Sequence, residues 1–452
     1  MDSKKRTASH SQYDRLAPKR RPQTKRRHEK LPEKETSRAS RAARRASAAA
    51  FETAGLTPNA APAGEAKIDE ILRNDRQKPV RQKKKFIPVD VPFFMLVFGL
   101  LCFGLIMMYS ASYAWAIHDT GTPYHYIKQQ LLCAGLGLGA MVFLAVFDYT
   151  RLKKWTVLYY LFAVALLVLV VFIGRTSNGA KRWLKIAGIT FQPSEFAKLA
   201  VIWMLAWLYS NLGKRVRNFW RMAAVLFGTL LPVVGLIFVE KHISAILLIC
   251  VTAGVMSFLA GAKVWHLGAL LGSGGGLLAM FAKISGKFGY ITARIGVWKD
   301  PFSDPRGLGY QTIQSLYAIA SGGVFGLGLG QSRQKQLYLP EAHNDYVFSI
   351  VCEELGLVGA VLLLVLFTAL IVRGYWIAMH AADKFGALLA SGITTLIALQ
   401  TLMNIAVVTN AMPVTGVSLP FFSYGGTSLV LLLAEMGIIL SVSKQMRTDR
   451  IL

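Results

Sequence analysis

Long apolar runs constrain this chain more than any other feature of its sequence. Several of them, such as Val91 to Trp115 and Tyr346 to Ile371, reach about 20 residues, the length that a helix needs to cross a lipid bilayer. The chain has 452 residues, 54% of them hydrophobic, and its mean hydropathy is +0.42. These values exclude an ordinary soluble domain, and they predict an all-α polytopic membrane protein.

The spacing of the apolar runs predicts about ten transmembrane helices. We expect them at residues 91–115, 128–147, 155–173, 195–212, 223–239, 243–260, 266–283, 346–371, 387–408 and 427–442. An even number places both termini on one side of the membrane. Basic residues near Arg151, Lys214 and Lys444 then all fall on the side of the basic N-terminal region, as expected of cytoplasmic loops. A large extracytoplasmic loop is predicted between the seventh and eighth helices.

Residues 1–86 differ in composition from the rest of the chain. They are rich in Lys, Arg, Ala, Ser and Pro, and they account for much of the net charge of +27. With few large apolar residues to form a core, this segment is predicted to be a disordered cytoplasmic tail, and residues 87–452 the membrane domain. The tail either fixes membrane topology or docks on anionic lipid or a partner protein. Beside so many spans, the charge does not indicate nucleic-acid binding.

Two predicted outer loops break the usual charge rule. One carries Arg175, Lys181, Arg182 and Lys185, and the other includes Lys283, Lys287, Arg333 and Lys335. Binding of an anionic, phosphate-bearing ligand at the outer surface would explain basic residues there. A miscounted topology is the alternative.

The polar stretch 309–355 holds the strongest candidate for chemistry. At its end Asp345 follows His343 and Asn344, directly before an apolar run. Asp345 is either a helix N-cap or a general base at the membrane boundary. Partial burial would raise its pKa toward neutrality, whereas nearby cations would oppose that rise.

Ionisable residues also occur inside the predicted spans, where they are costly and often functional. Glu195 and Lys198 are three residues apart, so they lie on one helical face, as substrate contacts or as a structural ion pair. Glu353 and Glu354 in the eighth span, and Glu435 in the tenth, are expected to pair with interior bases such as Lys198. The four cysteines lack a CxxC pair, so neither a zinc site nor a disulfide framework is indicated.

Two glycine-rich segments flank the eighth and ninth spans. Residues 321–330, SGGVFGLGLG, lack the strand and the GK[ST] ending of a phosphate-binding loop, so they indicate tight turns and close helix packing. Residues 412–428 contain two prolines and three glycines, so they cannot be helical throughout. At membrane depth such a segment must be buried in protein or line a cavity.

Three of these motifs together carry a resemblance to a known family. NGAKRWLKIAGITFQPSEFAKLA, the stretch from GYQTIQSLYAIASGG to PEAHNDYVFSIVCEELG, and MPVTGVSLPFFSYGGTSLV resemble the SEDS family of shape, elongation, division and sporulation proteins. The resemblance covers about residues 90–445. The segments YSAS, YHYIKQQL and QKQLYLPEAHNDYVF favour the cell-division branch, with the elongation and sporulation branches as alternatives.

The resemblance implies an activity. Members of the family polymerise lipid II, an undecaprenyl-pyrophosphate-linked disaccharide pentapeptide, into peptidoglycan glycan strands. Asp345 occupies the position of the family's essential aspartate and would act as the general base. Arg182, Glu195, Lys198, Lys335, Glu341 and His343 would contact substrate. The resemblance also implies a divalent cation, Mg²⁺ or Mn²⁺, for which no ligand cluster is evident.

The resemblance further implies partners and a location. A class B penicillin-binding protein would crosslink the strands, and other division proteins would gather at the septum of the cytoplasmic membrane. The sequence departs from the family pattern at His242, where an aspartate is common, and at Gln129, where a base is common. These departures concern secondary substrate contacts.

Two other classes of function remain open at this point. A lipid II flippase would also need many spans and intramembrane charges, although no inverted repeat of broken helices is visible. A non-catalytic scaffold would act through its tail, and the Asp345 motif argues against it.

Overall fold

The structure, a computed structural model, describes residues 89–446 apart from 178–179, 187–188, 241, 267, 270–271, 273–294 and 308. The predicted disordered tail, 1–86, and most of the predicted seventh span, 266–283, lie outside the described residues. Both therefore stay predictions.

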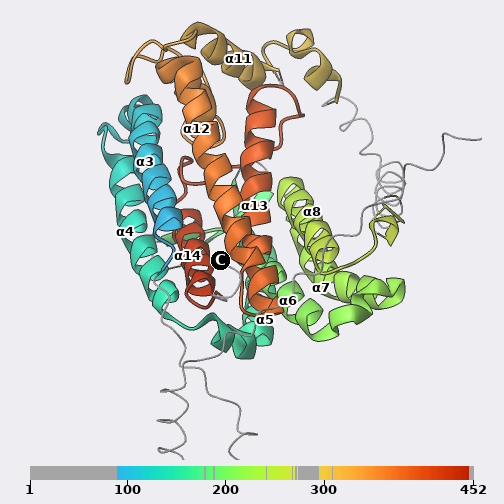
Figure 1. Cartoon of the computed structure of the whole chain (residues 1–452). Helices are drawn as coiled ribbons and strands as arrows, with labels where there is room; N and C mark the ends of the chain where they lie inside the picture. Colours follow the sequence, from blue (N-terminus) through green and yellow to red (C-terminus); the bar gives the residue numbers. More distant parts are fainter. Residues whose placement is uncertain are drawn as a thin grey trace, which may run out of the picture. The chain divides into compact units, whose positions relative to one another are not determined.

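The described residues form a bundle of long helices (Figure 1). Its helices are α3 Val91–Thr120, α4 His125–Val146, α5 Tyr149–Ile173, α6 Pro193–Leu212, α7 Phe219–Val239, α8 Ile243–Leu259, α12 Val347–Met379, α13 Lys384–Val408 and α14 Gly426–Ser443. Each matches one predicted span, with ends that mostly differ by a few residues. Shorter elements are the 3₁₀ helices η1 Gly213–Arg217 and η2 Pro301–Ser303, and the helix α11 Tyr310–Gly322.

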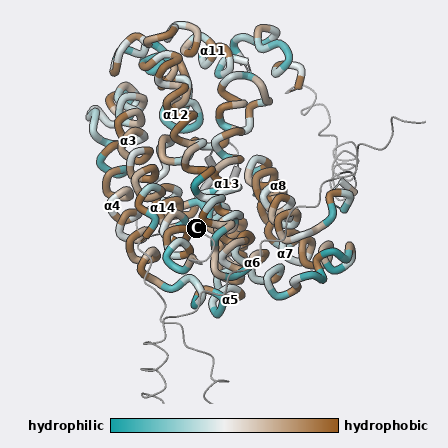
Figure 2. The backbone as a smooth tube through the Cα atoms, in the orientation of Figure 1, coloured by the Kyte–Doolittle hydropathy of each residue, from teal (hydrophilic) through white to brown (hydrophobic). Residues whose placement is uncertain are grey.

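Length and composition support the membrane assignment. Among the described residues, eight helices are long and apolar enough to cross a bilayer, and α8, with 17 residues, is apolar but shorter. Figure 2 shows the apolar residues running along the helices, whereas polar residues gather in the connecting segments. The polytopic helical fold is thus confirmed, and the total of ten spans remains a prediction.

A small sheet adds to the predicted all-α bundle. The segment between α5 and α6 forms β1 Arg175–Ser177, β2 Ala180–Ile186 and β3 Ile189–Phe191, in antiparallel order β1-β2-β3. The sequence analysis treated this segment as a polar loop. Its Asn-Gly and Ala-Gly pairs between short runs with β-branched residues are hairpin signals that were available in the sequence.

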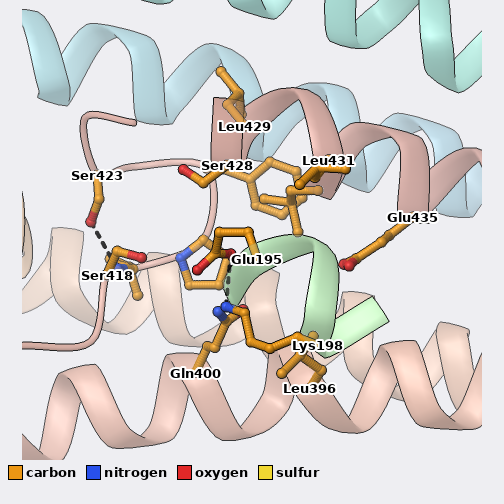
Figure 3. A pocket seen from close by; sticks show the side chains of 14 residues that line it. Glu195, Lys198, Leu396, Gln400, Ser418, Ser423, Ser428, Leu429, Leu431 and Glu435 are labelled. Carbon is orange, nitrogen blue, oxygen red and sulfur yellow. Dashed lines mark hydrogen bonds and ion pairs between the residues drawn. The ribbon is translucent and has the colours of Figure 1, made fainter. Parts of the chain in front are cut away.

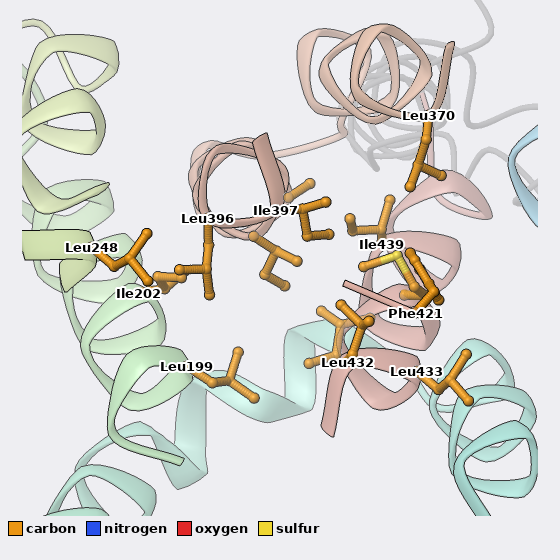
Figure 4. Close-up of a cluster of buried hydrophobic side chains, with 14 of the residues drawn as sticks. Leu199, Ile202, Leu248, Leu370, Leu396, Ile397, Phe421, Leu432, Leu433 and Ile439 are labelled. Atoms are coloured by element: carbon orange, nitrogen blue, oxygen red, sulfur yellow. The ribbon is translucent and has the colours of Figure 1, made fainter. Parts of the chain in front are cut away.

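Helix α13 lies at the centre of the packing. Figure 4 shows Leu396 and Ile397 of α13 between side chains of the surrounding helices, which include Leu199, Ile202, Leu248, Leu370, Leu433 and Ile439. Most of α13 is buried, whereas α3, α4, α5 and α12 each leave one apolar face exposed. Exposed apolar faces on a membrane protein are the surfaces that meet lipid.

The start of α3 and the end of α14 meet at one end of the bundle. Asp90 caps α3 by accepting a hydrogen bond from Phe93 N at 3.0 Å, and its own N–H donates to Ser443 Oγ at 3.2 Å. The guanidinium of Arg373 holds the Asp90 carboxylate at 2.8 Å. We refer to the opposite end, where α3 and α13 end, as the Asp345 end.

The glycine-rich segment 321–330 explains a break in α12. Gly356 has φ +65° and ψ −162°, which is not helical, and the chain at Gly326 crosses it so closely that a Cβ on Gly356 would lie 2.4 Å from Gly326 N. The N–H groups of Leu327 and Gly328 donate to the carbonyls of Glu353 and Glu354, both at 2.9 Å. The predicted role in tight turns and close packing is confirmed.

Candidate active site

Three successive carbonyls leading to Asp345 are each held by a hydrogen bond. Tyr424 N donates to His343 O at 2.8 Å, Ser423 Oγ donates to Asn344 O at 2.5 Å, and Asn404 Nδ2 donates to Asp345 O at 2.7 Å. The first two donors lie in the loop between α13 and α14, and the third lies on α13. The segment that carries Asp345 is therefore fixed against the 412–425 loop, which lines the site as predicted for an irregular segment.

Asn404 connects the segment that carries Asp345 to the 412–425 loop. It is buried, and besides Asp345 O its Nδ2 donates to Val417 O at 2.7 Å. Val417 follows Gly416, where an added Cβ would lie 3.2 Å from Asp345 Oδ2. The Asp345 carboxylate thus faces the backbone of the 412–425 loop.

The structure excludes the helix-cap role for Asp345. The N-cap of α12 is Tyr346, and no side chain caps this helix end. Within the described residues, neither carboxylate oxygen of Asp345 accepts a hydrogen bond, and the side chain is half-buried. Burial raises the pKa of Asp345 to about 6, the charge of Glu341 adds to the rise, and Arg182 opposes it.

The charges of Arg182 and Glu341 act on Asp345, and His343 precedes it by two residues. Arg182 projects from β2, half-buried, and its positive charge acts on Asp345. Glu341 is fixed by Asn344, whose Nδ2 donates to Glu341 Oε2 at 2.5 Å. Burial lowers the pKa of His343, although Glu341 and Asp119 oppose the shift, so His343 is neutral near pH 7.

Aromatic side chains surround His343. Its ring centre lies 4.8 Å from that of Tyr126, 5.9 Å from that of Tyr424 and 6.1 Å from that of Trp115. The Tyr126 hydroxyl donates to Asp119 Oδ2 at 2.5 Å. Gln129, where the resemblance leads us to expect a base, accepts a hydrogen bond from the Tyr424 hydroxyl at 2.7 Å.

Glu195 and Lys198 form an ion pair of 2.7 Å at the start of α6, so their predicted common face is confirmed. Figure 3 shows them lining a small pocket together with Gln400 of α13 and Glu435 of α14. Ser423 also lines this pocket. Since Ser423 also donates to Asn344 O, the 412–425 loop contacts both the pocket and the Asp345 segment.

Lys335 lies elsewhere, in a buried polar cluster. Its Nζ donates to Glu354 Oε1 at 2.8 Å and to Ser110 Oγ at 2.9 Å. Glu353 accepts hydrogen bonds from Ser332 Oγ and from Arg333 N. The expected partner of the α12 carboxylates was a base such as Lys198. The expected interior pairing with a base is confirmed for Glu354, but the base is Lys335 and not Lys198, because the 331–335 turn folds back onto α12.

The turn between α7 and α8 lies against β3 and α6. His242 Nδ1 is 3.2 Å from Gln192 Nε2 and 3.3 Å from Ser194 Oγ, and burial lowers the pKa of His242 to about 3. Burial raises the pKa of Glu240 to about 8, although Arg182 opposes the rise. A neutral His242 that accepts hydrogen bonds therefore stands where the resemblance leads us to expect an aspartate.

The sequence analysis missed Asn404 and Gly416. A lone Asn within an apolar run was the available signal for Asn404, since polar groups inside a membrane helix need a partner. For Gly416 no local signal existed, because its contact joins residues 71 positions apart.

Gly416→Ala tests the closeness of the loop to Asp345. Gly416 has φ +68°, which costs an Ala residue roughly 1–2 kcal/mol, and the new methyl group would crowd Asp345 Oδ2. We expect stability to fall by that amount, and any activity that depends on Asp345 to fall more than in a variant that suffers the backbone strain alone. Gly121→Ala is the matched control, because Gly121 has φ +72° with open space around it. Equal activity of the two variants, measured as the polymerisation that the resemblance implies, would contradict the contact.

Comparison with known proteins places the chain in a family. The family model of the cell cycle proteins FtsW, RodA and SpoVE matches residues 91–448. Stage V sporulation protein E of Bacillus subtilis is 41% identical over 80% of this chain and 99% of its own. A probable peptidoglycan glycosyltransferase FtsW of Geobacter sp. strain M18 is 38% identical over 79% and 97%.

Solved structures agree with this assignment. A chain of a peptidoglycan synthase complex, described as coordinating polymerization and crosslinking, aligns with a TM-score of 0.67 and 29% identity over 79% of this chain and 98% of that chain. The rod shape determining protein RodA of Thermus thermophilus aligns with a TM-score of 0.57 and 28% identity over 80% and 98%. The chain, a multi-pass membrane protein, therefore belongs to the FtsW/RodA/SpoVE family of cell cycle proteins.

Proposed function

We propose that this protein is a peptidoglycan glycosyltransferase that polymerises lipid II at the outer face of the cytoplasmic membrane. The observation that carries the proposal is Asp345, a half-buried carboxylate with a pKa of about 6 and a fixed backbone. The names of the relatives support the same activity.

In the proposed reaction, the 4-hydroxyl of the acceptor sugar attacks the anomeric carbon of the growing glycan chain. The new glycosidic C–O bond forms as the bond to the lipid pyrophosphate breaks, and the hydroxyl proton passes to the Asp345 carboxylate. A sugar hydroxyl is a weak acid, so a carboxylate of raised pKa is a better proton acceptor than an exposed one. The raised pKa arises from burial and from Glu341.

The leaving group is highly anionic, and cations near Asp345 would stabilise its developing charge. Among the described residues, Arg182 is the cation whose charge acts on the Asp345 carboxylate, so we propose that it contacts the pyrophosphate. Glu195, Lys198, Glu341 and His343 remain proposed substrate contacts. Lys335 is engaged in a buried ion pair, so its proposed role is to fix the outer segment.

A divalent cation was expected as well. The described residues hold no group of three His, Cys, Asp or Glu side chains that could hold a metal ion. The described residues therefore do not form a metal site from protein ligands alone. The reaction above includes no step through a metal. Mg²⁺ is often held by one or two carboxylates plus substrate phosphates, so the cation stays a proposal that chelation followed by Mg²⁺ addition would test.

The pH dependence of the reaction tests the role of Asp345. The base works only when deprotonated, and burial raises its pKa to about 6. The rate with saturating lipid II should therefore be constant above neutrality and fall about tenfold per pH unit below 6. A rate that stays flat down to pH 4.5 in a protein that remains folded would contradict Asp345 as the base.

Purified protein incubated with lipid II alone tests the proposed function. A polymerase forms glycan strands, a flippase in vesicles moves lipid II between leaflets without polymer, and a scaffold does neither. Glycan strands are the expected result. No observation of the structure specifically favours the flippase.

We further propose that a class B penicillin-binding protein crosslinks the strands, as the description of the related synthase complex supports. We propose an interface on the eighth and ninth spans, α12 and α13, where Leu364 and Leu396 are the positions to consider for cysteine crosslinking. Leu396 is 2% exposed and faces the core, so only the α12 position, Leu364, at 39% exposure, is suitable. A septal role in division is part of this proposal, and the sporulation and division relatives match about equally well.

A further inference from the structure

An apolar projection stands at the Asp345 end of α12. Residues 324–329, here called the apolar tip, leave Val324, Phe325, Leu327 and Leu329 exposed, and Phe325 is 83% exposed. From Ala318 to Ser332 the sequence contains no ionisable residue. Exposed apolar patches of this kind mark a surface that is covered by lipid or by another protein.

The backbone of the apolar tip is largely satisfied from within the chain. Leu327 N and Gly328 N donate to the carbonyls of Glu353 and Glu354, and Gly326 N donates to Gly322 O at 2.8 Å. In return the N–H groups of Leu357 and Val358 donate to the carbonyls of Gly323 and Val324, at 3.0 and 3.2 Å. Irregular backbone enters hydrocarbon only where its N–H and C=O groups are hydrogen-bonded within the protein. The hydrogen bonds given above satisfy much of this requirement for the apolar tip.

The apolar tip also continues the lipid-facing strip of α12. Leu357 and Val358, which bond its backbone, are exposed, as are Val361, Leu362 and Val365 further along the helix. The tip therefore extends the same apolar surface beyond the break at Gly356. The strip on α12 and the apolar tip form one continuous apolar surface, so lipid that covers the strip would also cover the tip.

We propose that the apolar tip inserts into the hydrocarbon of the membrane leaflet at the Asp345 end. Lipid is the occupant that fits an uncharged apolar surface whose backbone is largely hydrogen-bonded and which is continuous with a membrane helix. Because the tip is bonded to α12 at Glu353 and Glu354, its insertion fixes the depth of the chain segment that ends at Asp345. The inference rests on the membrane fold and not on the proposed activity.

Fluorescence quenching in vesicles tests this insertion. Phe325→Cys and, separately, Val324→Cys are made in a full-length background whose native Cys102, Cys133, Cys250 and Cys352 are Ala. Each variant is labelled with an environment-sensitive dye and reconstituted alone in phosphatidylethanolamine–phosphatidylglycerol vesicles. Leu364→Cys, on the exposed face of α12, serves as the lipid control, and Arg306→Cys, exposed in the polar outer segment, serves as the water control.

Insertion predicts that doxyl-labelled lipid quenches the dye at positions 324 and 325 about as strongly as at Leu364, and several-fold more than at Arg306. Iodide in the water should quench it several-fold less than at Arg306. Strong iodide quenching would overturn the proposal by placing the tip in water. Protection from both quenchers would also overturn it, since the tip would then be covered by a second copy of the chain. Thermal melting of each labelled variant shows that it is folded.

Discussion

Asp345→Asn should reduce glycan synthesis from lipid II by about 10²- to 10⁴-fold, the range that a general base contributes. The amide has almost the same shape but cannot accept the proton of the attacking hydroxyl. The backbone contacts that hold residue 345, through Asn404 and through the 412–425 loop, do not involve the carboxylate, so they remain. The loss should therefore appear in kcat, with KM and the melting temperature nearly unchanged.

The matched control for this variant is Asp300→Asn. Asp300 is an exposed carboxylate of the same outer segment, where it caps η2 through Phe302 N at 3.1 Å. It should retain near-normal synthesis. If Asp345→Asn polymerised lipid II as well as Asp300→Asn does, Asp345 would have no part in the chemistry.

Lys335→Met should destabilise the protein by about 3–5 kcal/mol, the usual loss when one partner of a buried ion pair is removed. Lys335 is 3% exposed and its Nζ contacts Glu354 and Ser110, so the variant leaves a buried carboxylate without its cation. Thermal or denaturant unfolding in detergent measures the loss. Activity per folded molecule should change little, because the pair lies outside the Asp345 site.

A second substitution distinguishes this role from substrate binding. In Lys335→Met with Glu354→Gln, no unpaired charge remains, so most of the lost stability should return. Arg333→Met, an exposed cation two residues away, should leave stability unchanged. The structural role would be wrong if Lys335→Met unfolded like the wild type and only raised KM for lipid II, as a substrate contact would.

Local patterns in the sequence were sufficient for the helices and for the candidate base. A membrane helix satisfies its own backbone within one segment, so length and hydropathy alone predict where it begins and ends. Nine predicted spans match helices for that reason. Glu195 and Lys198 were placed on one face because helical spacing is local. The motif with Asp345 was found because its neighbours in sequence are also its neighbours in space.

Contacts between distant segments decided the rest, because hydropathy and spacing say nothing about which helices meet. The sequence allowed two roles for Asp345, a helix N-cap and a general base. The N-cap role is excluded because Tyr346 occupies that position. The sequence suggested Lys198 as one possible partner for Glu354, whereas in the structure the 331–335 turn places Lys335 beside Glu354. Asn404 and Gly416 acquire their places beside Asp345 only when α13 and its following loop pack against the start of α12. The sequence by itself thus determined the membrane helices and indicated Asp345 as the candidate base, whereas the burial that raises the pKa of this carboxylate exists only in the packed bundle.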